Sequence, residues 1–294
     1  MIRNTNRIYF KQFIPLFLFS KPIKVDEILT EKKSFRLDTS LSYTNGNRKE
    51  GSLAPFQYQT QNGDLITIPT YLGDSKSNQD YIGYALSLRY GVSEDIEIFS
   101  SVNLFTSDTH FEAENRFGTK SEKGFNNFNI GFTYQVKKED ERPSLLLGTN
   151  ITTVERTKFK DSSKNLFFKG YSFFATSFYT VDPVVFFLKA SYSLSLEKKD
   201  NNNTINNGNM FVLSPQVYFA VNPYTSMNWG IRYSYHDKSK IDGNVVSGSG
   251  SDVAYLFGTS YEINAKSTLN VDIEHSNGVS SSRNNIAFSL SYKL

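Results

Sequence analysis

The last ten residues of the chain alternate strictly between large apolar side chains and small or polar ones. The apolar positions are Ile286, Phe288, Leu290, Tyr292 and Leu294, and the positions between them are Ala287, Ser289, Ser291 and Lys293. Because successive side chains of a β-strand point to opposite faces, this period of two predicts a strand rather than a helix. An amphipathic strand at the end of the chain leaves an edge to pair, and the simplest partner is the first strand.

The same alternation returns about twelve times from Ser34 onward, and it is most regular in residues 184–196. Most runs are about 10–14 residues long, whereas membrane-spanning strands need roughly 9–11 residues and strands of soluble proteins usually have about 5–6. Residues 171–180 carry aromatic side chains on both faces, so their register stays open. The pattern predicts an all-β fold, an antiparallel up-and-down transmembrane β-barrel of about 12 strands with its apolar face toward lipid.

The connections between the predicted strands alternate between short and long. The short ones are residues 93–95, 138–143, 181–183, 222–225 and 264–266, and the long ones are residues 45–78, 106–123, 155–169, 197–209, 237–251 and 276–283. Bacterial outer-membrane barrels have short periplasmic turns and long outer loops, so this alternation, with an even number of strands, predicts that both termini of the barrel chain lie on the periplasmic side. Residues 56–71 contain a further hairpin, expected on the surface, with an extension of the wall or a lid across the opening as alternatives.

The N-terminal residues 1–28 are predicted to be an export signal, which leaves residues 29–294 for the barrel. Arg3, Arg7 and Lys11 precede a short apolar run that covers residues 13–19. A positive stretch followed by an apolar one is typical of a signal peptide, although the pattern does not fix the cleavage point. The alternative is an amphipathic segment that stays on the protein.

Tyrosines on the apolar face gather near both ends of the predicted strands. Near the presumed periplasmic ends are Tyr90, Tyr134, Tyr261 and Tyr292, and toward the other ends are Tyr43, Tyr233 and Tyr235. Tyrosine is enriched where a membrane meets water, because its ring is apolar and its hydroxyl group is polar. The positions predict two interfacial belts, with tyrosine as a general strand former as the alternative.

Composition and charge narrow the function classes. Hydrophobic residues make up 38% of the 294 residues and the mean hydropathy is −0.41, which is low for a membrane protein built of helices. A barrel needs no long apolar run, because only every second residue meets lipid. The chain has no cysteine, which excludes disulfides and thiolate metal sites. The net charge of +3 is too small to indicate nucleic acid, so we expect no nucleic-acid partner. We also expect no metal and no cofactor.

Three segments resemble a known family. They are residues 90–98, residues 124–134 with the following Arg142-Pro143, and residues 257–261. The first has Tyr-Gly before a polar turn, and an apolar-acidic-apolar sequence begins the strand that follows the turn. Together the segments resemble the outer-membrane barrel family labelled as transporters of the meta-pathway of phenol degradation. The resemblance implies a barrel of about 12 strands over residues 34–294 and passage of small solutes, aromatic or apolar ones included. It carries over no functional residue.

Ionisable residues on the polar face are candidates for lining a water-filled lumen. They are Arg36, Asp38, Arg89, Glu97, Lys137, Lys189, Arg232, Glu262, Asp272 and Glu274. Both signs occur, so the lumen is not a simple funnel for cations or anions, and in a narrow barrel facing charges can pair across it. The hypothesis is that these groups set the selectivity of the path. The alternative is that they form salt bridges that merely fill the barrel.

These patterns predict a porin-like channel of the outer membrane that passes small solutes passively and is not an enzyme. The expected partners are outer-membrane lipid, a small-molecule solute and, through the C-terminal strand, the barrel-assembly machinery. The first alternative is a non-conducting structural or surface-interaction barrel. The second is an outer-membrane lipid hydrolase, for which only His110, His236 and His275 are available as a general base.

Overall fold

The structure is a computed structural model that describes residues 28–48, 56–59, 65–68, 76–113, 116–159, 162–200, 203–278 and 281–294. The predicted export signal, apart from Ile28, lies outside the described residues. Among the residues that are described, no helix has the length and apolar character needed to cross a membrane.

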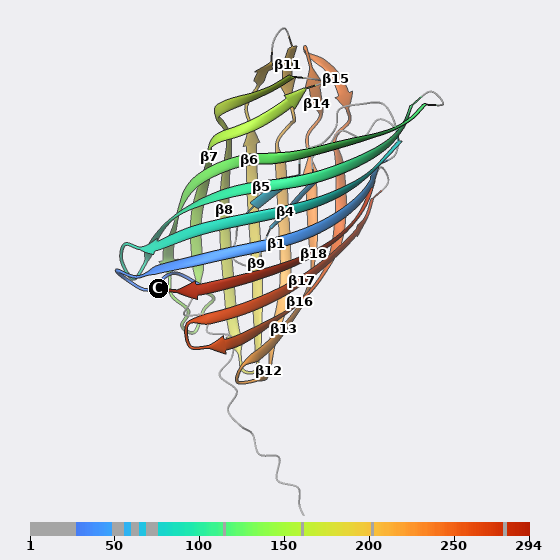
Figure 1. The fold of residues 1–294 in the computed structure, drawn as a ribbon. Coiled ribbons are helices and arrows are strands. Elements are labelled where there is room, and N and C mark those ends of the chain that lie inside the picture. The colour runs from blue at the N-terminus through green and yellow to red at the C-terminus, as the bar shows by residue number, and fades with distance from the viewer. Residues whose placement is uncertain are drawn as a thin grey trace, which may run out of the picture.

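Within this described part of the chain, twelve long antiparallel strands close into one barrel (Figure 1). They are β1 (Phe35–Arg48), β4 (Lys76–Gly91), β5 (Ile96–Ala113), β6 (Arg116–Lys137), β7 (Leu145–Phe159), β8 (Ser162–Val181), β9 (Val184–Ser195), β12 (Met210–Asn222), β13 (Thr225–His236), β16 (Gly250–Asn264), β17 (Ser267–Asn277) and β18 (Ser281–Lys293). Each barrel strand pairs with its neighbour in the chain, so the predicted up-and-down topology is confirmed.

The barrel closes where the first and last strands meet. β1 pairs with β18 along its whole length, from Arg36 opposite Lys293 to Arg48 opposite Ser281. The C-terminal strand therefore has its two edges paired, with β1 on one side and β17 on the other. Closure removes the free edge that an amphipathic terminal strand would otherwise expose.

The alternation of side chains sorts the wall into an outer apolar face and an inner polar face. On the outer face Phe186, Leu188 and Phe288 are 51%, 44% and 45% exposed, whereas Ser289, next to Phe288, is 3% exposed. The aromatic segment whose register the pattern leaves open also alternates, because Phe178 is buried inside while Phe173 is exposed outside. An apolar exterior around a polar interior is the arrangement of a barrel that spans a bilayer.

The strands continue well beyond the apolar band, and here the predicted loops are wrong. The expected loop at residues 106–123 is mostly strand, because β5 runs to Ala113 and β6 begins at Arg116. The expected loop at residues 155–169 is likewise shortened by β7 and β8. Outside the membrane both faces of a strand can be polar, so backbone pairing continues after the apolar signal has stopped.

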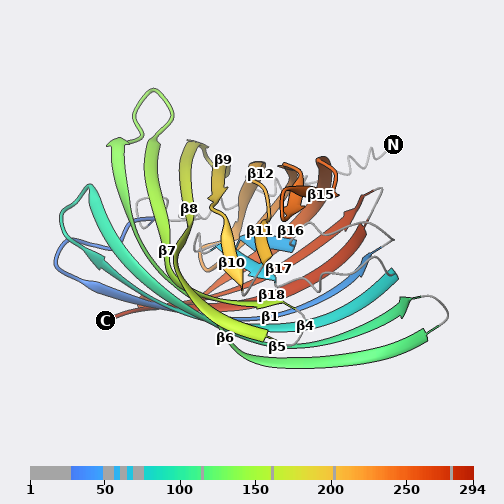
Figure 2. The same cartoon turned by 90° about the horizontal axis from the view of Figure 1, so that it is seen from above.

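A smaller, four-stranded sheet lies at the outer end of the barrel. β10 (Lys198–Asp200), β11 (Asn203–Asn206), β14 (Ser239–Ile241) and β15 (Asn244–Ser247) form a sheet in that order. It lies at the top of the barrel in Figure 1, and β10 and β11 lie over the interior when the barrel is seen from above (Figure 2). The segments that build it were predicted as plain loops.

The predicted hairpin in residues 56–71 is confirmed as a pair of short strands. β2 (Phe56–Gln59) pairs with β3 (Leu65–Ile68), and Asn62 and Gly63 of the predicted turn lie outside the described residues. Both views place the two strands inside the outline of the barrel rather than on its outer surface (Figures 1 and 2). This position differs from the surface hairpin expected from the sequence.

Candidate functional site

A short segment, Ile28–Ser34, lies against the inner wall at the periplasmic end of the lumen. Thr30 donates hydrogen bonds from its backbone N–H and its hydroxyl group to Glu97 Oε2 on β5, at 2.7 and 2.6 Å. The preceding residue, Leu29, packs against the inner faces of β7, β8 and β9, where it forms an apolar cluster. The members of that cluster are Leu29, Leu146, Phe178 and Val185, with Ile28, Phe187 and Tyr218 packed against it.

Leu29 and Thr30 link two neighbouring parts of the wall. Thr30 bonds to β5 and Leu29 packs on β7, β8 and β9, and only β6 separates β5 from β7. The segment therefore lies inside the lumen, against the wall that runs from β5 to β9. Burial of a leucine side chain contributes roughly 1.5–3 kcal/mol, so the apolar cluster helps to hold the segment in place.

Gly91, the last residue of β4, allows the segment to lie this close to the wall. Lys33 donates its backbone N–H to the Gly91 carbonyl oxygen at 2.7 Å. A Cβ atom at Gly91 would lie 2.2 Å from the Glu31 carbonyl oxygen and 2.4 Å from that of Thr30. Any side chain here would push the segment out of its position, so glycine is required by close approach of two backbones.

Four of the predicted lumen residues form a charge cluster beside this segment. Arg89 donates to Asp38 at 2.7 Å and to Glu97 at 2.8 Å, and Arg36 lies 3.5 Å from Asp38 and 3.7 Å from Glu97. Asp38 and Glu97 are almost completely buried. Two guanidinium groups face two carboxylates, so the formal charge of this periplasmic cluster is zero.

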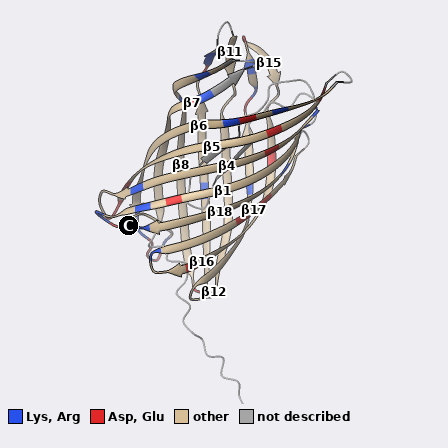
Figure 3. Ribbon diagram, in the orientation of Figure 1, with Lys and Arg blue, Asp and Glu red and all other residues tan. Residues whose placement is uncertain are grey.

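A second charge cluster lies further out on the opposite side of the β1–β18 seam. Glu274 on β17 accepts hydrogen bonds from Arg232 on β13 and from Arg283 on β18. Arg48 on β1 is buried on the same inner face and is one register step from Arg283, which lies opposite Gly46. Figure 3 shows charged residues concentrated toward the strand ends, with a largely uncharged wall between them.

The charge pairs run along the wall, which differs from the pairing across the lumen expected for a narrow barrel. Arg89 lies on β4, directly between the β1 and β5 strands that carry its partners. Arg232 reaches Glu274 past a single intervening strand, β16. Long arginine side chains find carboxylates on neighbouring strands within their reach, so the centre of the lumen is not needed for pairing.

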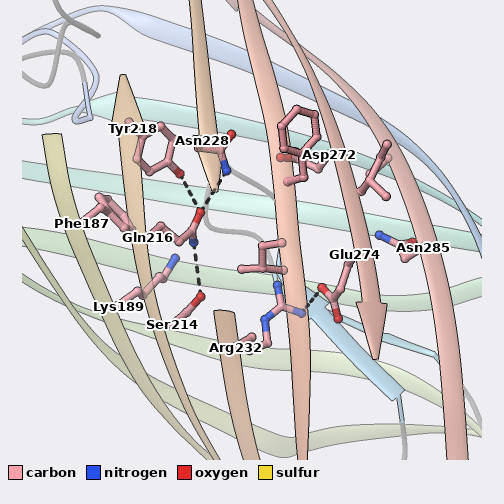
Figure 4. Close-up of a pocket in the computed structure, with 14 residues that line it drawn as sticks. Phe187, Lys189, Ser214, Gln216, Tyr218, Asn228, Arg232, Asp272, Glu274 and Asn285 are labelled. Carbon is pink, nitrogen blue, oxygen red and sulfur yellow. Dashed lines mark hydrogen bonds and ion pairs between the residues drawn. The ribbon is translucent and has the colours of Figure 1, made fainter. Parts of the chain in front are cut away.

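Beside the second cluster the inner wall forms a hollow, shown in Figure 4. Its cavity volume is about 50 Å³, and it adjoins unfilled space that includes open solvent. Its inward-facing lining includes Phe187, Lys189, Ser214, Gln216, Tyr218, Asn228, Arg232, Asp272, Glu274 and Asn285. A hydrogen-bonded chain crosses it, because Tyr218 and Asn228 both donate to Gln216 Oε1 and Gln216 donates to Ser214 Oγ. Charged, amide and aromatic groups therefore meet in one place on the wall.

The remaining predicted lumen residues lie at the periplasmic rim. Lys137 Nζ donates to Asp140 Oδ1 at 3.0 Å in the turn after β6, which lowers the pKa of the Asp140 carboxyl group. Glu262 is half-buried at the end of β16, next to the turn that leads to β17. The structure does not bring either residue into a charge cluster.

Sequence reasoning missed Arg48, Arg283 and the segment at Leu29–Thr30. The two arginines fell within predicted long loops, although each continues the inward parity of its strand. Arg48 has the parity of Asp38, and Arg283 that of Ser289. Extending the alternation by a few residues would have found them. The segment carries no periodic signal, since it is held by single contacts.

The predicted interfacial tyrosines lie on the outer face. Tyr134, Tyr261, Tyr292, Tyr43 and Tyr235 are between 39% and 50% exposed, and Tyr90 is half-buried against Phe35 with the ring centroids 4.7 Å apart. Tyr43 donates from its hydroxyl group to Asp80 at 2.6 Å. The interfacial role itself stays a prediction.

The three histidines do not form a site with one another. His110 and His275 are exposed and lie near Thr119 and Asn284, at 2.9 and 2.7 Å, and the His236 ring lies 3.3 Å from the Asp237 carbonyl oxygen. Within the described ranges, no group of three or more metal-binding side chains comes together. The arrangement lends no support to the hydrolase alternative.

The comparisons with known proteins bear on the fold. No family model and no curated protein matches the sequence. An outer-membrane channel from Pseudomonas putida F1 superposes with a TM-score of 0.65 at 11% identity, over 90% of this chain and 97% of that chain. The translocator domain of the autotransporter NalP from Neisseria meningitidis superposes with a TM-score of 0.54 at 8% identity, over 92% of this chain and 91% of that chain. At such identities the likeness shows the fold and not the activity. The predicted fold, a closed antiparallel β-barrel, is confirmed, whereas the family named from the sequence resemblance stays a prediction.

Proposed function

We propose that this protein is an outer-membrane channel that passes small solutes passively, aromatic or apolar ones included. One observation carries the proposal: a closed wall, apolar outside, surrounds a polar interior with a hollow in its inner face. Serine, threonine, asparagine and arginine side chains on the inner face can hydrogen-bond water, so the interior is suited to an aqueous path.

The segment Ile28–Ser34 determines which solutes this path can take. It occupies part of the lumen at the periplasmic end, so a solute that passes must go around it or displace it. The arrangement favours small solutes over large ones, and it makes the segment the principal resistance of the channel. The aromatic side chains on the inner wall, Phe187 and Tyr218 among them, offer an apolar surface to a solute waiting there.

The same segment also favours a second candidate, a non-conducting structural barrel. Its contacts with Glu97 and with the apolar cluster around Leu29 hold it against the wall from β5 to β9. A segment that never leaves would make the barrel a closed surface component of the envelope. The two candidates differ in one measurable quantity, the ionic conductance of the purified protein.

Planar-bilayer recordings test the proposal with the variant Gly91→Val. The valine side chain overlaps the Glu31 and Thr30 carbonyl oxygens and displaces the segment. The unmodified protein should give discrete current steps, and Gly91→Val should raise the conductance severalfold. Gly248→Val is the matched control, because a Cβ atom there meets nothing within 4 Å, and it should conduct like the unmodified protein.

Proper folding of each variant is checked by heat-dependent migration on gels. If neither the unmodified protein nor folded Gly91→Val conducts, the channel proposal is wrong and the non-conducting barrel is favoured. If the unmodified protein conducts and Gly91→Val does so equally, the channel stands but the segment is not its resistance.

A further inference from the structure

Two cationic side chains, Lys189 and Arg232, lie on the strands on either side of Ser214 in the hollow. Lys189 on β9 lies opposite Ser214 on β12. The flanking pairs on the other side, Leu213 with Tyr233 and Gln216 with Gly230, place Arg232 on β13 level with the same serine. Lys189 and Arg232 are thus two strand spacings apart, about 10 Å between their backbones, and both long side chains lean into the hollow (Figure 4). An anion above Ser214 can approach both of them.

The charge around the hollow is positive on balance. Glu274 is shared between Arg232 and Arg283, so this trio keeps one positive charge in excess. Lys189 adds a second positive charge, and Asp272, which lines the hollow beside Tyr218, offsets one of the two. Arg48 and Asp252 lie further out and do not line the hollow, and their formal charges cancel. The local field therefore favours an anion over a cation or a neutral solute.

Aromatic rings lie one or two register steps toward the periplasm from these cations. Phe187 precedes Lys189 by two residues on β9, and its ring packs edge-on against that of Tyr218 with the centroids 5.6 Å apart. Two residues along a strand cover about 7 Å, which is close to the distance from a carboxylate to the far edge of an attached benzene ring. Both rings pack against the apolar cluster that contains Leu29.

We infer that this hollow is a binding subsite for a small aromatic carboxylate. The carboxylate lies above Ser214 between Lys189 and Arg232, and the aryl ring lies against Phe187 and Tyr218. Charge-assisted hydrogen bonds from a lysine and an arginine are stronger than those between neutral groups, so the charge decides affinity and the rings decide shape. The inference rests on the proposed function, because it takes the lumen to be a path that solutes enter.

Isothermal titration calorimetry on the folded full-length protein in detergent tests the subsite with three probes of one shape. Benzoate carries a negative charge, benzamide none and benzylamine a positive one. Benzoate should bind at least about tenfold more tightly than benzamide, and benzylamine most weakly, because a charge-assisted pair is replaced by a neutral one or by repulsion.

Variants locate the effect. Lys189→Gln should weaken benzoate binding about tenfold while leaving benzamide unchanged, and Lys189→Arg should restore benzoate binding. Lys137→Gln is the matched control, since this lysine lies at the rim and outside the hollow, and it should bind benzoate normally. Heat-dependent gel migration verifies that each variant is folded.

The inference is overturned if benzoate and benzamide bind equally, if benzoate does not bind at millimolar concentration, or if Lys137→Gln weakens it as much as Lys189→Gln does. These results leave the bilayer conductance untouched, so failure of the subsite is distinguished from failure of the channel. Conversely, a protein that binds benzoate as described but carries no current keeps the subsite and loses the channel.

Discussion

The two charge clusters of the lumen are built from the same side chains and differ in what they face. At the periplasmic end Arg36 and Arg89 are matched by two buried carboxylates, and the segment at Thr30 uses the remaining acceptor capacity of Glu97. In the second cluster a single carboxylate, Glu274, is shared by two arginines beside an open hollow. The side chains of both clusters are buried, but the first cluster is balanced in charge, whereas the second holds two arginines to one glutamate and lies beside the hollow.

The difference separates structural from functional charge. Buried ion pairs are costly to break because one partner is left unpaired in a medium of low dielectric constant. A balanced cluster against a fixed segment therefore contributes to the position of that segment, whereas excess charge beside a hollow can act on a solute. Substitutions in the first cluster should change stability and conductance, and those in the second should change selectivity.

Arg89→Ala is expected to have the largest effect. It removes the guanidinium group shared by Asp38 and Glu97, which are 2% and 0% exposed, and should lower the free energy of unfolding by about 3–5 kcal/mol. Urea unfolding of the protein in lipid vesicles, followed by tyrosine and tryptophan fluorescence, measures it. Lys189→Gln is the comparison and should change stability by less than about 1 kcal/mol. An equal loss in both variants would contradict the distinction between the clusters.

Glu274→Gln should have an intermediate effect, on selectivity. The change keeps the shape of the side chain and leaves Arg232 and Arg283 without their shared carboxylate, which adds one positive charge to the wall. One charge at about 4 Å in water is worth roughly 1 kcal/mol, so the chloride-to-potassium permeability ratio should rise about fivefold at low salt. Reversal potentials in a potassium chloride gradient give this ratio. An unchanged or lower ratio would show that the second cluster does not act on ions in the path.

Tyr43→Phe should have the smallest effect. The hydroxyl group donates to Asp80 on the outer face of the barrel, where both groups remain accessible, and its loss should cost about 0.5 kcal/mol. The same urea titration detects it, with Tyr235→Phe as a control that lies at a similar level on another strand. A loss above 2 kcal/mol would mean that this outer contact matters as much as the buried clusters.

The sequence was sufficient for the architecture because a barrel wall is periodic. In strands such as residues 184–196 the alternation of apolar and polar residues identifies the two faces. The terminal strand at residues 285–294 predicts closure onto β1. The extents of the strands were harder to predict. Beyond the membrane both faces are polar, so β5 and β6 continue through a region where the apolar signal has ended.

The candidate site was predictable only in part. Parity alone places Asp38, Arg89 and Glu274 on the inner face, but it does not say which charges meet, because pairing depends on strand register and on side-chain reach. The segment at Leu29 and Thr30 carried no signal, since its position comes from contacts with strands far away in the sequence. The requirement for glycine at position 91 is explained only by the close approach of that segment.

The most direct test of the whole account is the chemical accessibility of neighbouring residues on one strand. The chain has no cysteine, so single substitutions give a clean background. Lys189→Cys should react with a small membrane-impermeant thiol reagent when the protein is in lipid vesicles, because this half-buried position faces the interior of the barrel. Leu188→Cys, the next residue on the same strand, should not react, because it faces lipid. Reaction of Leu188→Cys and protection of Lys189→Cys would contradict the account.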